Sequence, residues 1–299
     1  MVSEQAIKDM VQQIIQQLSM DNQQVAEEQD LQNADTKVET EVPLDNTELK
    51  DLTEIKMQDY FAVPDPANKE VYLGLKESTP ARVGIWRAGP RYRTETLLRF
   101  RADHAVAMDA VFTYVSEEFL EEMELFSVST LCRDKDEYVT RPDLGRKFSE
   151  EAIATIKERC VKNPQVQIYV SDGLSSTAIE ANVKDILPSI MQGLENYGLK
   201  AGTPFFVKHG RVPAMDVVSE ALDAQVTIVL IGERPGLATG ESMSCYMAYR
   251  AKVGMPESRR TVISNIHKGG TSATEAGAHI AHIIKEMIEQ KASGLDLKL

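Results

Sequence analysis

The chain has 299 residues, of which 42% are hydrophobic and 26% charged, enough for one large globular domain or two ordinary ones. No apolar run approaches the roughly 18–20 residues that span a bilayer, and the N-terminus lacks the pattern of a secretory signal, so no membrane segment is expected. The three cysteines are widely spaced and form no CxxC pair, which argues against a disulfide framework or zinc ribbon and favours a cytoplasmic setting.

The N-terminal segment carries most of the net charge of −13, because residues 1–60 contain 14 Asp and Glu against 4 Lys. The remainder is close to neutral. Nucleic-acid binding is therefore not indicated, since a basic footprint exists only in one short region. Residues 21–60 are predicted to be an acidic linker, partly disordered, because Asp21–Val42 is polar and lacks aromatic residues.

Residues 1–20 are predicted to form an amphipathic targeting helix. Their apolar side chains recur at helical spacing, at Ile7, Met10, Val11, Ile14, Ile15 and Leu18. A short helix of this kind on an acidic tether is suited to docking in a groove of another protein. The alternative is that it packs on its own domain or on a second copy of the chain.

Residues 61–160 are predicted to be a mainly helical domain. A short helix is expected just before it, at Leu49–Tyr60, and a turn at Gly89-Pro90. A long helix is expected from Thr94, and a further helix at Glu150–Val161.

The stretch Gly84–Phe112 stands out because it combines the only tryptophan, Trp86, with a series of arginines in an acidic chain. Those arginines, with one just upstream, are Arg82, Arg87, Arg91, Arg93, Arg99 and Arg101. Arginine pairs with carboxylates and phosphates and stacks on flat groups, so the stretch suggests a surface that receives an anionic ligand or a protein. Ion pairing within a helix is the simpler explanation for Arg99. The stretch's position in the helical half favours a face that docks another protein or that clamps the two halves of the chain together.

Residues 161–299 are predicted to be an α/β domain, because short apolar strands alternate with helices. The predicted strands are Val166–Val170, Pro204–Lys208, Gln225–Ile231 and Thr261–Ile266, and the predicted helices are Ala178–Tyr197, Ala214–Ala224 and Ser272–Gln290. This order is typical of a doubly wound, mainly parallel, Rossmann-like sheet. Each strand ends in a polar, glycine-containing turn, and such sheets bind ligands at the carboxyl ends of their strands. Taken singly, each glycine could be purely structural.

The familiar catalytic and nucleotide motifs are missing. There is no GxGxxG after a strand, no GxxxxGK[ST] and no GxSxG. Asp172, His209 and Glu233 could act in acid–base chemistry, but no nucleophile accompanies them. His279 and His282 lack a third ligand at metal-binding spacing, so no metal site and no catalytic residue is predicted.

With these residues laid out, the chain resembles the small (light) subunit of ethanolamine ammonia-lyase. The matching strings run in order from about residue 80 to the end: WRAGPRYRTETLLRFRADHAVAMDAVF, CRDKDEYVTRPDLGR, VSDGLSS, GRV, LIGERPGL, ESMSCYMAYR, RTVISNIHKGG and EQKASGLDLK. The resemblance implies an adenosylcobalamin-dependent lyase that converts ethanolamine to acetaldehyde and ammonia. It also implies a larger barrel subunit that holds the substrate, a hetero-oligomer, and a location inside a bacterial microcompartment reached through the N-terminal helix.

By the same resemblance, the cobalamin contacts map to Val212, Glu233 and Val262. Position 262 departs from the family, where we associate it with cysteine. A backbone contact survives that change, whereas a sulfur-specific role does not. The DxHxxG motif of other cobalamin proteins is absent, so the base-on form of the cofactor is expected.

Two other functions compete with an enzyme subunit that is inactive alone. One is a non-catalytic assembly or adaptor protein, whose arginine stretch docks a partner and whose crevice is vestigial. The other is a self-sufficient α/β enzyme acting on a phosphate ester.

Overall fold

The computed structural model describes residues 51–299, which form one compact unit. The helix predicted for residues 1–20 and most of the linker predicted for residues 21–60 lie outside the described residues. None of the described helices is long and apolar enough to cross a membrane.

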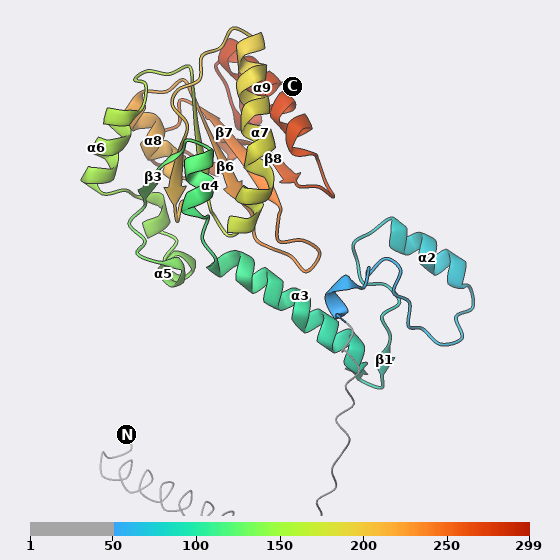
Figure 1. Cartoon of the computed structure of the whole chain (residues 1–299). Helices are drawn as coiled ribbons and strands as arrows, with labels where there is room; N and C mark the ends of the chain where they lie inside the picture. The colour runs from blue at the N-terminus through green and yellow to red at the C-terminus, as the bar shows by residue number, and fades with distance from the viewer. Residues whose placement is uncertain (1–50) are drawn as a thin grey trace, which may run out of the picture. The chain divides into compact units, whose positions relative to one another are not determined.

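The centre of this unit is a six-stranded sheet with the order β3-β5-β4-β6-β7-β8 (Figure 1). The strands are β3 (Phe126–Ser129), β4 (Val166–Ser171), β5 (Phe205–Lys208), β6 (Val226–Gly232), β7 (Met243–Tyr249) and β8 (Thr261–Ile266). The first four in the sheet order run parallel, and β7 is antiparallel to both of its neighbours. Because β6 and β8 are both antiparallel to β7, they point the same way.

All four predicted strands are confirmed, as β4, β5, β6 and β8. Two strands of this six-stranded sheet were not predicted. β3 lies inside the range 61–160 expected to be mainly helical, and it is a four-residue edge strand whose inward and outward residues alternate. β7 follows a loop, and its predominantly buried pattern between two neighbours gives no alternation to recognise.

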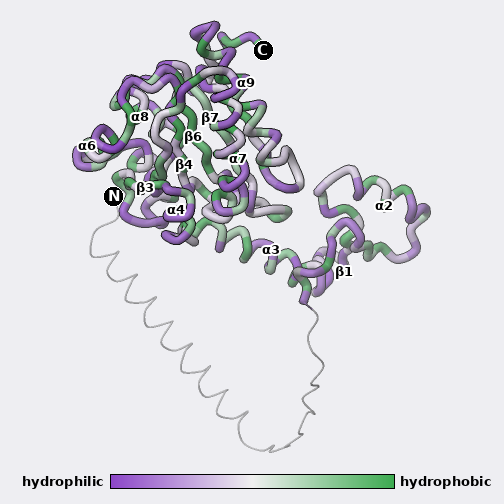
Figure 2. The backbone as a smooth tube through the Cα atoms, turned by 45° about the horizontal axis from the view of Figure 1, so that its top comes forward, coloured by the Kyte–Doolittle hydropathy of each residue, from purple (hydrophilic) through white to green (hydrophobic). Residues whose placement is uncertain are grey.

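Helices cover both faces of the sheet, which confirms the doubly wound α/β prediction. α7 (Ser176–Asn196) and α9 (Ala273–Gln290) pack on one face, and α6 (Glu150–Arg159) and α8 (Ala214–Leu222) on the other. Side chains that alternate along β4 supply both cores: Ile168 and Val170 face α7, and Tyr169 faces α8. Figure 2 shows the hydrophobic residues gathered along β4, β6 and β7.

The predicted helices of the second half are confirmed to within two residues at each end. Local capping explains several of their starts, because a serine side chain accepts the third helical N–H at α6, α7 and α9. The predicted helix from Thr94 is α3 (Thr94–Phe112). The smaller helices α4 (Glu117–Glu122) and α5 (Lys135–Thr140) flank β3.

The helix predicted at Leu49–Tyr60 is wrong for its described part. Only one 3₁₀ turn forms there, η1 (Leu52–Glu54). The Arg99 guanidinium donates to the carbonyl oxygens of Leu52 and Ile55, which diverts acceptors that a continuing helix would use.

The chain continues from η1 into α2 (Lys69–Glu77), a helix that was not predicted, and then into a two-stranded hairpin. That hairpin joins β1 (Arg87–Ala88) to β2 (Arg91–Tyr92). The turn predicted at Gly89-Pro90 is confirmed, since these two residues connect the two strands.

Candidate functional site

The turns that follow β4, β5, β6 and β8 lie at one edge of the sheet, because these four strands point the same way. They begin at Asp172, His209, Glu233 and His267. The first three follow adjacent strands, whereas β7 separates the fourth from β6. The predicted strand-end edge therefore exists, with its polar turns on it.

Two glycines of this edge have a structural reason. A Cβ added to Gly232 would lie 2.0 Å from the carbonyl oxygen of Ser175, and one added to Gly173 would lie 2.3 Å from that of Gly232. Gly173 also has a φ of +54°, a backbone conformation that residues other than glycine rarely adopt. The end of β6 thus packs backbone to backbone against the turn that begins α7.

Beneath the turns lies a buried polar cluster. The Lys135 ammonium, from α5, is 2.7 Å from the Asp172 carboxylate, and both side chains are almost fully buried. The other carboxylate oxygen of Asp172 accepts the backbone N–H of His209 at 2.8 Å. These bonds join the start of α5 to the ends of β4 and β5.

His209 itself is enclosed. Its Nδ1 lies 3.3 Å from the carbonyl oxygen of Cys132, its ring contacts Tyr114 and Tyr138, and its Nε2 is buried without a hydrogen-bond partner among the described residues. Burial lowers the pKa of His209, although Asp172 opposes this. A neutral imidazole with Nδ1–H donating to the carbonyl accounts for these contacts. Asp172 and His209 are thus occupied in holding the fold, and Glu233 contacts neither.

The residues assigned by resemblance lie on the α8 side of the sheet or at its edge. Val212, between β5 and α8, is half-buried against the α8-side core. Glu233 directly follows β6 and is half-buried. Val262, on the edge strand β8, is 47% exposed and pairs across the strands with Tyr246 of β7.

Tyr246 connects two of these residues and was missed by the sequence reading. Its hydroxyl donates to Glu233 Oε1 at 2.9 Å, and its ring is the cross-strand neighbour of Val262. Burial, followed by Glu233, raises the pKa of Tyr246 to about 12, so the hydroxyl remains a donor. Within the described chain, Glu233 Oε2 takes no hydrogen bond. No local motif marks Tyr246, because only the strand pairing brings it to Glu233.

The loop after Glu233 is tied down from two sides. Ser175 and Thr177 donate to the carbonyl oxygen of Gly240, and Asn182 donates to that of Glu241. From the other side, Arg82 donates to the carbonyl oxygen of Leu237 at 3.2 Å.

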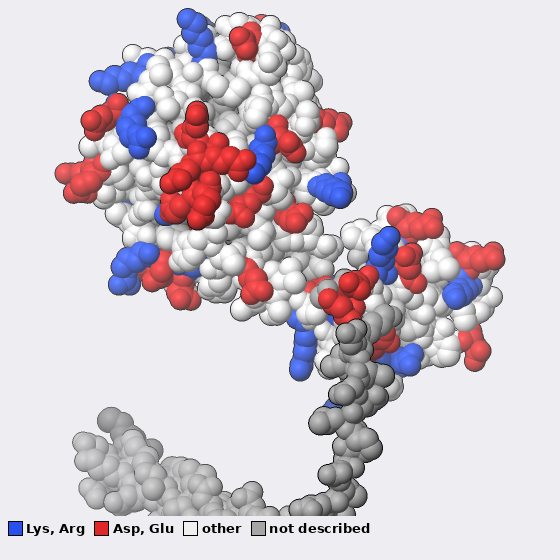
Figure 3. All heavy atoms as spheres, viewed as in Figure 1, with Lys and Arg blue, Asp and Glu red and all other residues white. Residues whose placement is uncertain are grey.

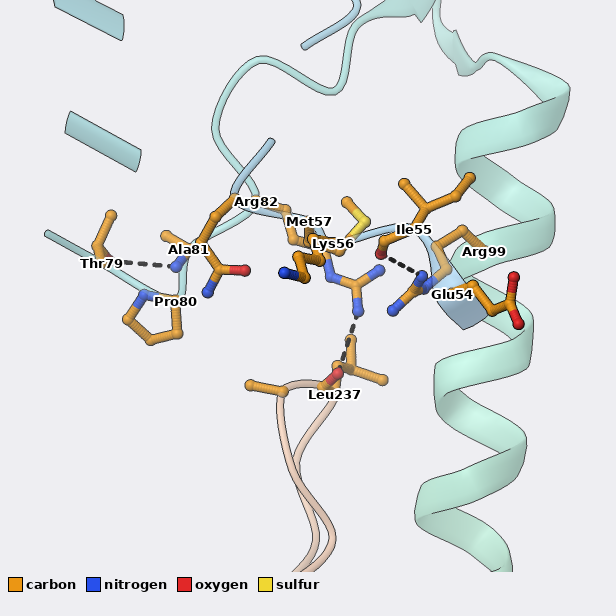
Figure 4. A pocket seen from close by; sticks show the side chains of 12 residues that line it. Glu54, Ile55, Lys56, Met57, Thr79, Pro80, Ala81, Arg82, Arg99 and Leu237 are labelled. Carbon is orange, nitrogen blue, oxygen red and sulfur yellow. Dashed lines mark hydrogen bonds between the residues drawn. The ribbon is translucent and has the colours of Figure 1, made fainter. Parts of the chain in front are cut away.

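Figure 4 shows Arg82 and Arg99 at a cavity of about 670 Å³ between η1, the segment before Arg82, and Leu237. Both guanidinium groups pair with Asp103, Arg99 at 3.0 Å. These two arginines therefore clamp segments of the chain together.

The other arginines of the stretch are exposed. Arg87 stacks on the ring of Tyr92 at 4.7 Å in the hairpin, and Arg91, Arg93 and Arg101 face outward. The predicted receiving surface is thus reduced to four arginines that point away from the folded core.

The helix α3 between these arginines and the sheet also exposes apolar side chains. Only two of its 19 residues, Thr96 and Ala110, are buried. Its exposed large apolar residues are Leu97, Leu98, Phe100, Val106, Met108 and Phe112. A groove of about 440 Å³ runs between α3 and the loop at Arg234–Leu237. An apolar surface of this kind marks an interaction site.

A different surface, over α4, is acidic (Figure 3). Glu117 pairs with Lys208 and Glu122 with Lys184, both at 2.7 Å. No group of three His, Cys, Asp or Glu that could hold a metal occurs among residues 51–299. His279 and His282 are both exposed, and His282 lies 3.4 Å from the hydroxyl of Tyr197.

These features define a doubly wound α/β protein with a polar strand-end edge and an exposed apolar helix. Residues 69–298 match the family described as ethanolamine ammonia-lyase light chain (EutC). Among curated proteins, the chain is 64% identical over 251 residues to the ethanolamine ammonia-lyase small subunit of Clostridium tetani, covering 84% of this chain and 85% of that protein. The small subunit of Clostridium perfringens is 56% identical and that of Listeria innocua 54%, each over 99% of this chain and all of the relative.

The chain therefore belongs to the small-subunit family of ethanolamine ammonia-lyase, a carbon–nitrogen lyase. This confirms the resemblance drawn from the sequence strings.

Proposed function

We propose that the chain completes the adenosylcobalamin site of an ethanolamine ammonia-lyase at its contact with a catalytic large subunit. The edge formed by the turns after β5 and β6 offers polar and apolar groups to a ligand. Such an edge suits a protein that binds and orients a cofactor while the cofactor supplies the difficult chemistry. The contacts would come from Val212, Glu233 and Val262.

The residues present fit cobalamin by the chemistry of their groups. The corrin ring carries peripheral amides, which are N–H donors, around a largely apolar macrocycle. Glu233 Oε2 is a carboxylate acceptor without a partner in the described chain, and Val262 exposes an apolar side chain on β8. When bound, adenosylcobalamin supplies a radical through homolysis of its cobalt–carbon bond. The chain's own residues hold and orient the cofactor and exclude water from its face.

The exposed apolar side chains of α3 support the proposal that this chain acts with a large subunit. Four large apolar side chains of this helix are between 42% and 54% exposed, namely Leu98, Phe100, Val106 and Met108. Exposing apolar surface to water is unfavourable, and a partner that covers these side chains removes that free-energy cost. The exposed arginines at one end of α3 would pair with acidic groups of that partner. The relatives are named small subunits, which supports the same assignment. We further propose that the enzyme lies in a bacterial microcompartment, directed there by residues 1–20.

The decisive experiment mixes adenosylcobalamin and ethanolamine with the purified chain, with the large subunit, or with both. We expect the spectrum of cob(II)alamin and the release of acetaldehyde only when both chains are present. Turnover by this chain alone would instead indicate a self-sufficient enzyme.

A second comparison tests the adaptor alternative. Replacing Val212 by Glu and Glu233 by Lys in the assembled enzyme should weaken cobalamin binding, because both changes oppose the chemistry of the site. Normal assembly and normal turnover in the double variant would favour a non-catalytic adaptor with a vestigial crevice.

A further inference from the structure

Tyr246 connects two of the proposed cofactor contacts, Glu233 after β6 and Val262 near the start of β8. Its backbone lies in the middle of three strands, paired with Val229 on one side and Val262 on the other. Its ring packs against the α8-side core, and its hydroxyl reaches Glu233 Oε1 at 2.9 Å. One side chain thus contacts the acceptor of the site and borders its apolar part.

A glutamate at the start of a loop has three rotatable side-chain bonds, and its carboxylate would otherwise sample many positions. The bond from Tyr246 fixes one oxygen and leaves the other open. Because the tyrosine is rooted in a central strand, the carboxylate is held by the sheet and not by the loop that follows it. A pre-oriented acceptor loses less freedom when a ligand binds.

We propose that Tyr246 is a positioning residue that fixes the Glu233 carboxylate so that Oε2 alone is offered to an amide N–H of the corrin periphery. This inference rests on the proposed cobalamin site. Tyr246 acts through Glu233 and makes no contact with the reacting atoms. Its contribution is to cofactor affinity, whereas the rate at saturating cofactor depends on the substrate site of the large subunit.

The test uses Tyr246→Phe in the complete complex with the large subunit, because phenylalanine keeps the ring and removes only the hydroxyl. Binding of hydroxocobalamin is measured by equilibrium dialysis, and the KM for adenosylcobalamin by turnover. We expect the dissociation constant and the KM to rise roughly three- to tenfold, with kcat unchanged. Tyr249→Phe is the matched control, since Tyr249 lies on the same strand and faces the opposite core.

Two further variants establish that the effect passes through Glu233. Glu233→Asp keeps the charge but shortens the side chain away from Tyr246, so it should weaken binding to a similar degree. In a Glu233→Ala background, Tyr246→Phe should add little, because the group it orients is gone. Glu233→Asp also serves as the test if Tyr246→Phe impairs assembly.

The outcomes separate the two proposals. Normal hydroxocobalamin affinity in Tyr246→Phe, with weak binding in Glu233→Ala, would overturn the positioning role and leave the cofactor site standing. Normal affinity in both variants would overturn the cofactor site itself. An equal effect of Tyr246→Phe with and without Glu233 would show that the tyrosine does not act through the carboxylate, which also contradicts the inference.

Discussion

At the scale of single residues, the chain places its buried charges where they hold the strand-end edge together. Lys135 and Asp172 are 3% and 2% exposed, and each neutralises the other. A buried ion pair contributes little against an apolar replacement of both partners, but removing one partner leaves an uncompensated charge. The contact between the start of α5 and the end of β4 therefore does not tolerate the replacement of either Lys135 or Asp172 alone.

Lys135→Met should destabilise the chain by about 3–5 kcal/mol, because Asp172 then remains buried without its cation. Urea unfolding of the purified chain, followed by circular dichroism, measures the change. Lys184→Met is the control, since its pair with Glu122 is solvent-exposed and should contribute little. Equal stability of the two variants would contradict this reading of the cluster.

His209 predicts a dependence of stability on pH. Its pKa is lowered in the folded chain, chiefly by burial, so the unfolded chain takes up the proton first as the pH falls. Neutral His209 therefore contributes stability at pH values above 6.5, the ordinary pKa of histidine. This contribution is lost as the pH falls below that value. His209 therefore lowers the urea midpoint at pH 5.5 relative to pH 7.5, whereas Asp216, whose pKa burial raises to about 6, contributes in the opposite direction.

His209→Asn should make this difference between the two pH values smaller, because asparagine does not titrate and tolerates the left-handed backbone at φ +59°. His279→Asn, at an exposed histidine of α9, should leave the difference as in the unmodified chain. A pH dependence that is the same in all three proteins would assign it to other groups.

At the scale of elements, the arginines in and just before α3 have two functions. Arg82 and Arg99 are half-buried against Asp103 and fasten neighbouring segments, while Arg91 and Arg93 are exposed just before the helix. An exposed charge such as Arg91 or Arg93 affects association with a partner more than it affects the stability of the chain itself. The helix is thus fixed at its inner side and free at its outer side.

Charge reversal of both exposed arginines, in the variant Arg91→Glu/Arg93→Glu, should weaken association with the large subunit by about tenfold or more. Analytical ultracentrifugation of the mixed subunits measures this. Once assembled at high concentration, the variant should bind hydroxocobalamin with unchanged affinity. Unaltered assembly would show that the partner contacts another face.

At the scale of the whole molecule, the negative charge is concentrated in residues 1–60 of the sequence, and the rest of the chain is close to neutral. Residues 1–50 and residues 51–299 are separate units, and the family match begins only at residue 69. Residues 1–20 precede the residues that carry the proposed cofactor contacts, which leaves them available for a role in location. This separation agrees with the proposed targeting role of residues 1–20.

Deletion of residues 1–20 should therefore leave the specific activity of the assembled enzyme unchanged and release it from microcompartments into the cytoplasm. Fractionation of cells that express the tagged deletion variant measures the distribution. The control replaces Gln12 and Gln13 by Ala, because both residues lie off the apolar stripe of the predicted helix. A deletion variant that remains with the compartments would contradict the targeting role.

The sequence by itself determined the α/β class, four of the six strands of the central sheet and the family, because hydrophobic periodicity and the order of the matching strings are local properties of the chain. It also placed Glu233 at a strand end. It did not predict β3 or β7, since β3 is too short for its alternation to stand out in the sequence and β7 is buried on both sides. Nor could it exclude the helix at Leu49–Tyr60, which is interrupted by a side chain 44 or more residues away.

Only the tertiary structure decided what each polar residue does. Sheet pairing brings Tyr246 to Glu233 and Val262, folding buries Lys135 with Asp172, and packing divides the arginines into clamps and exposed charges. The physical reason is that the partner, and the degree of removal from water, determine how a polar side chain acts. Both are set by residues distant in the chain, so they follow from the fold and not from the local sequence.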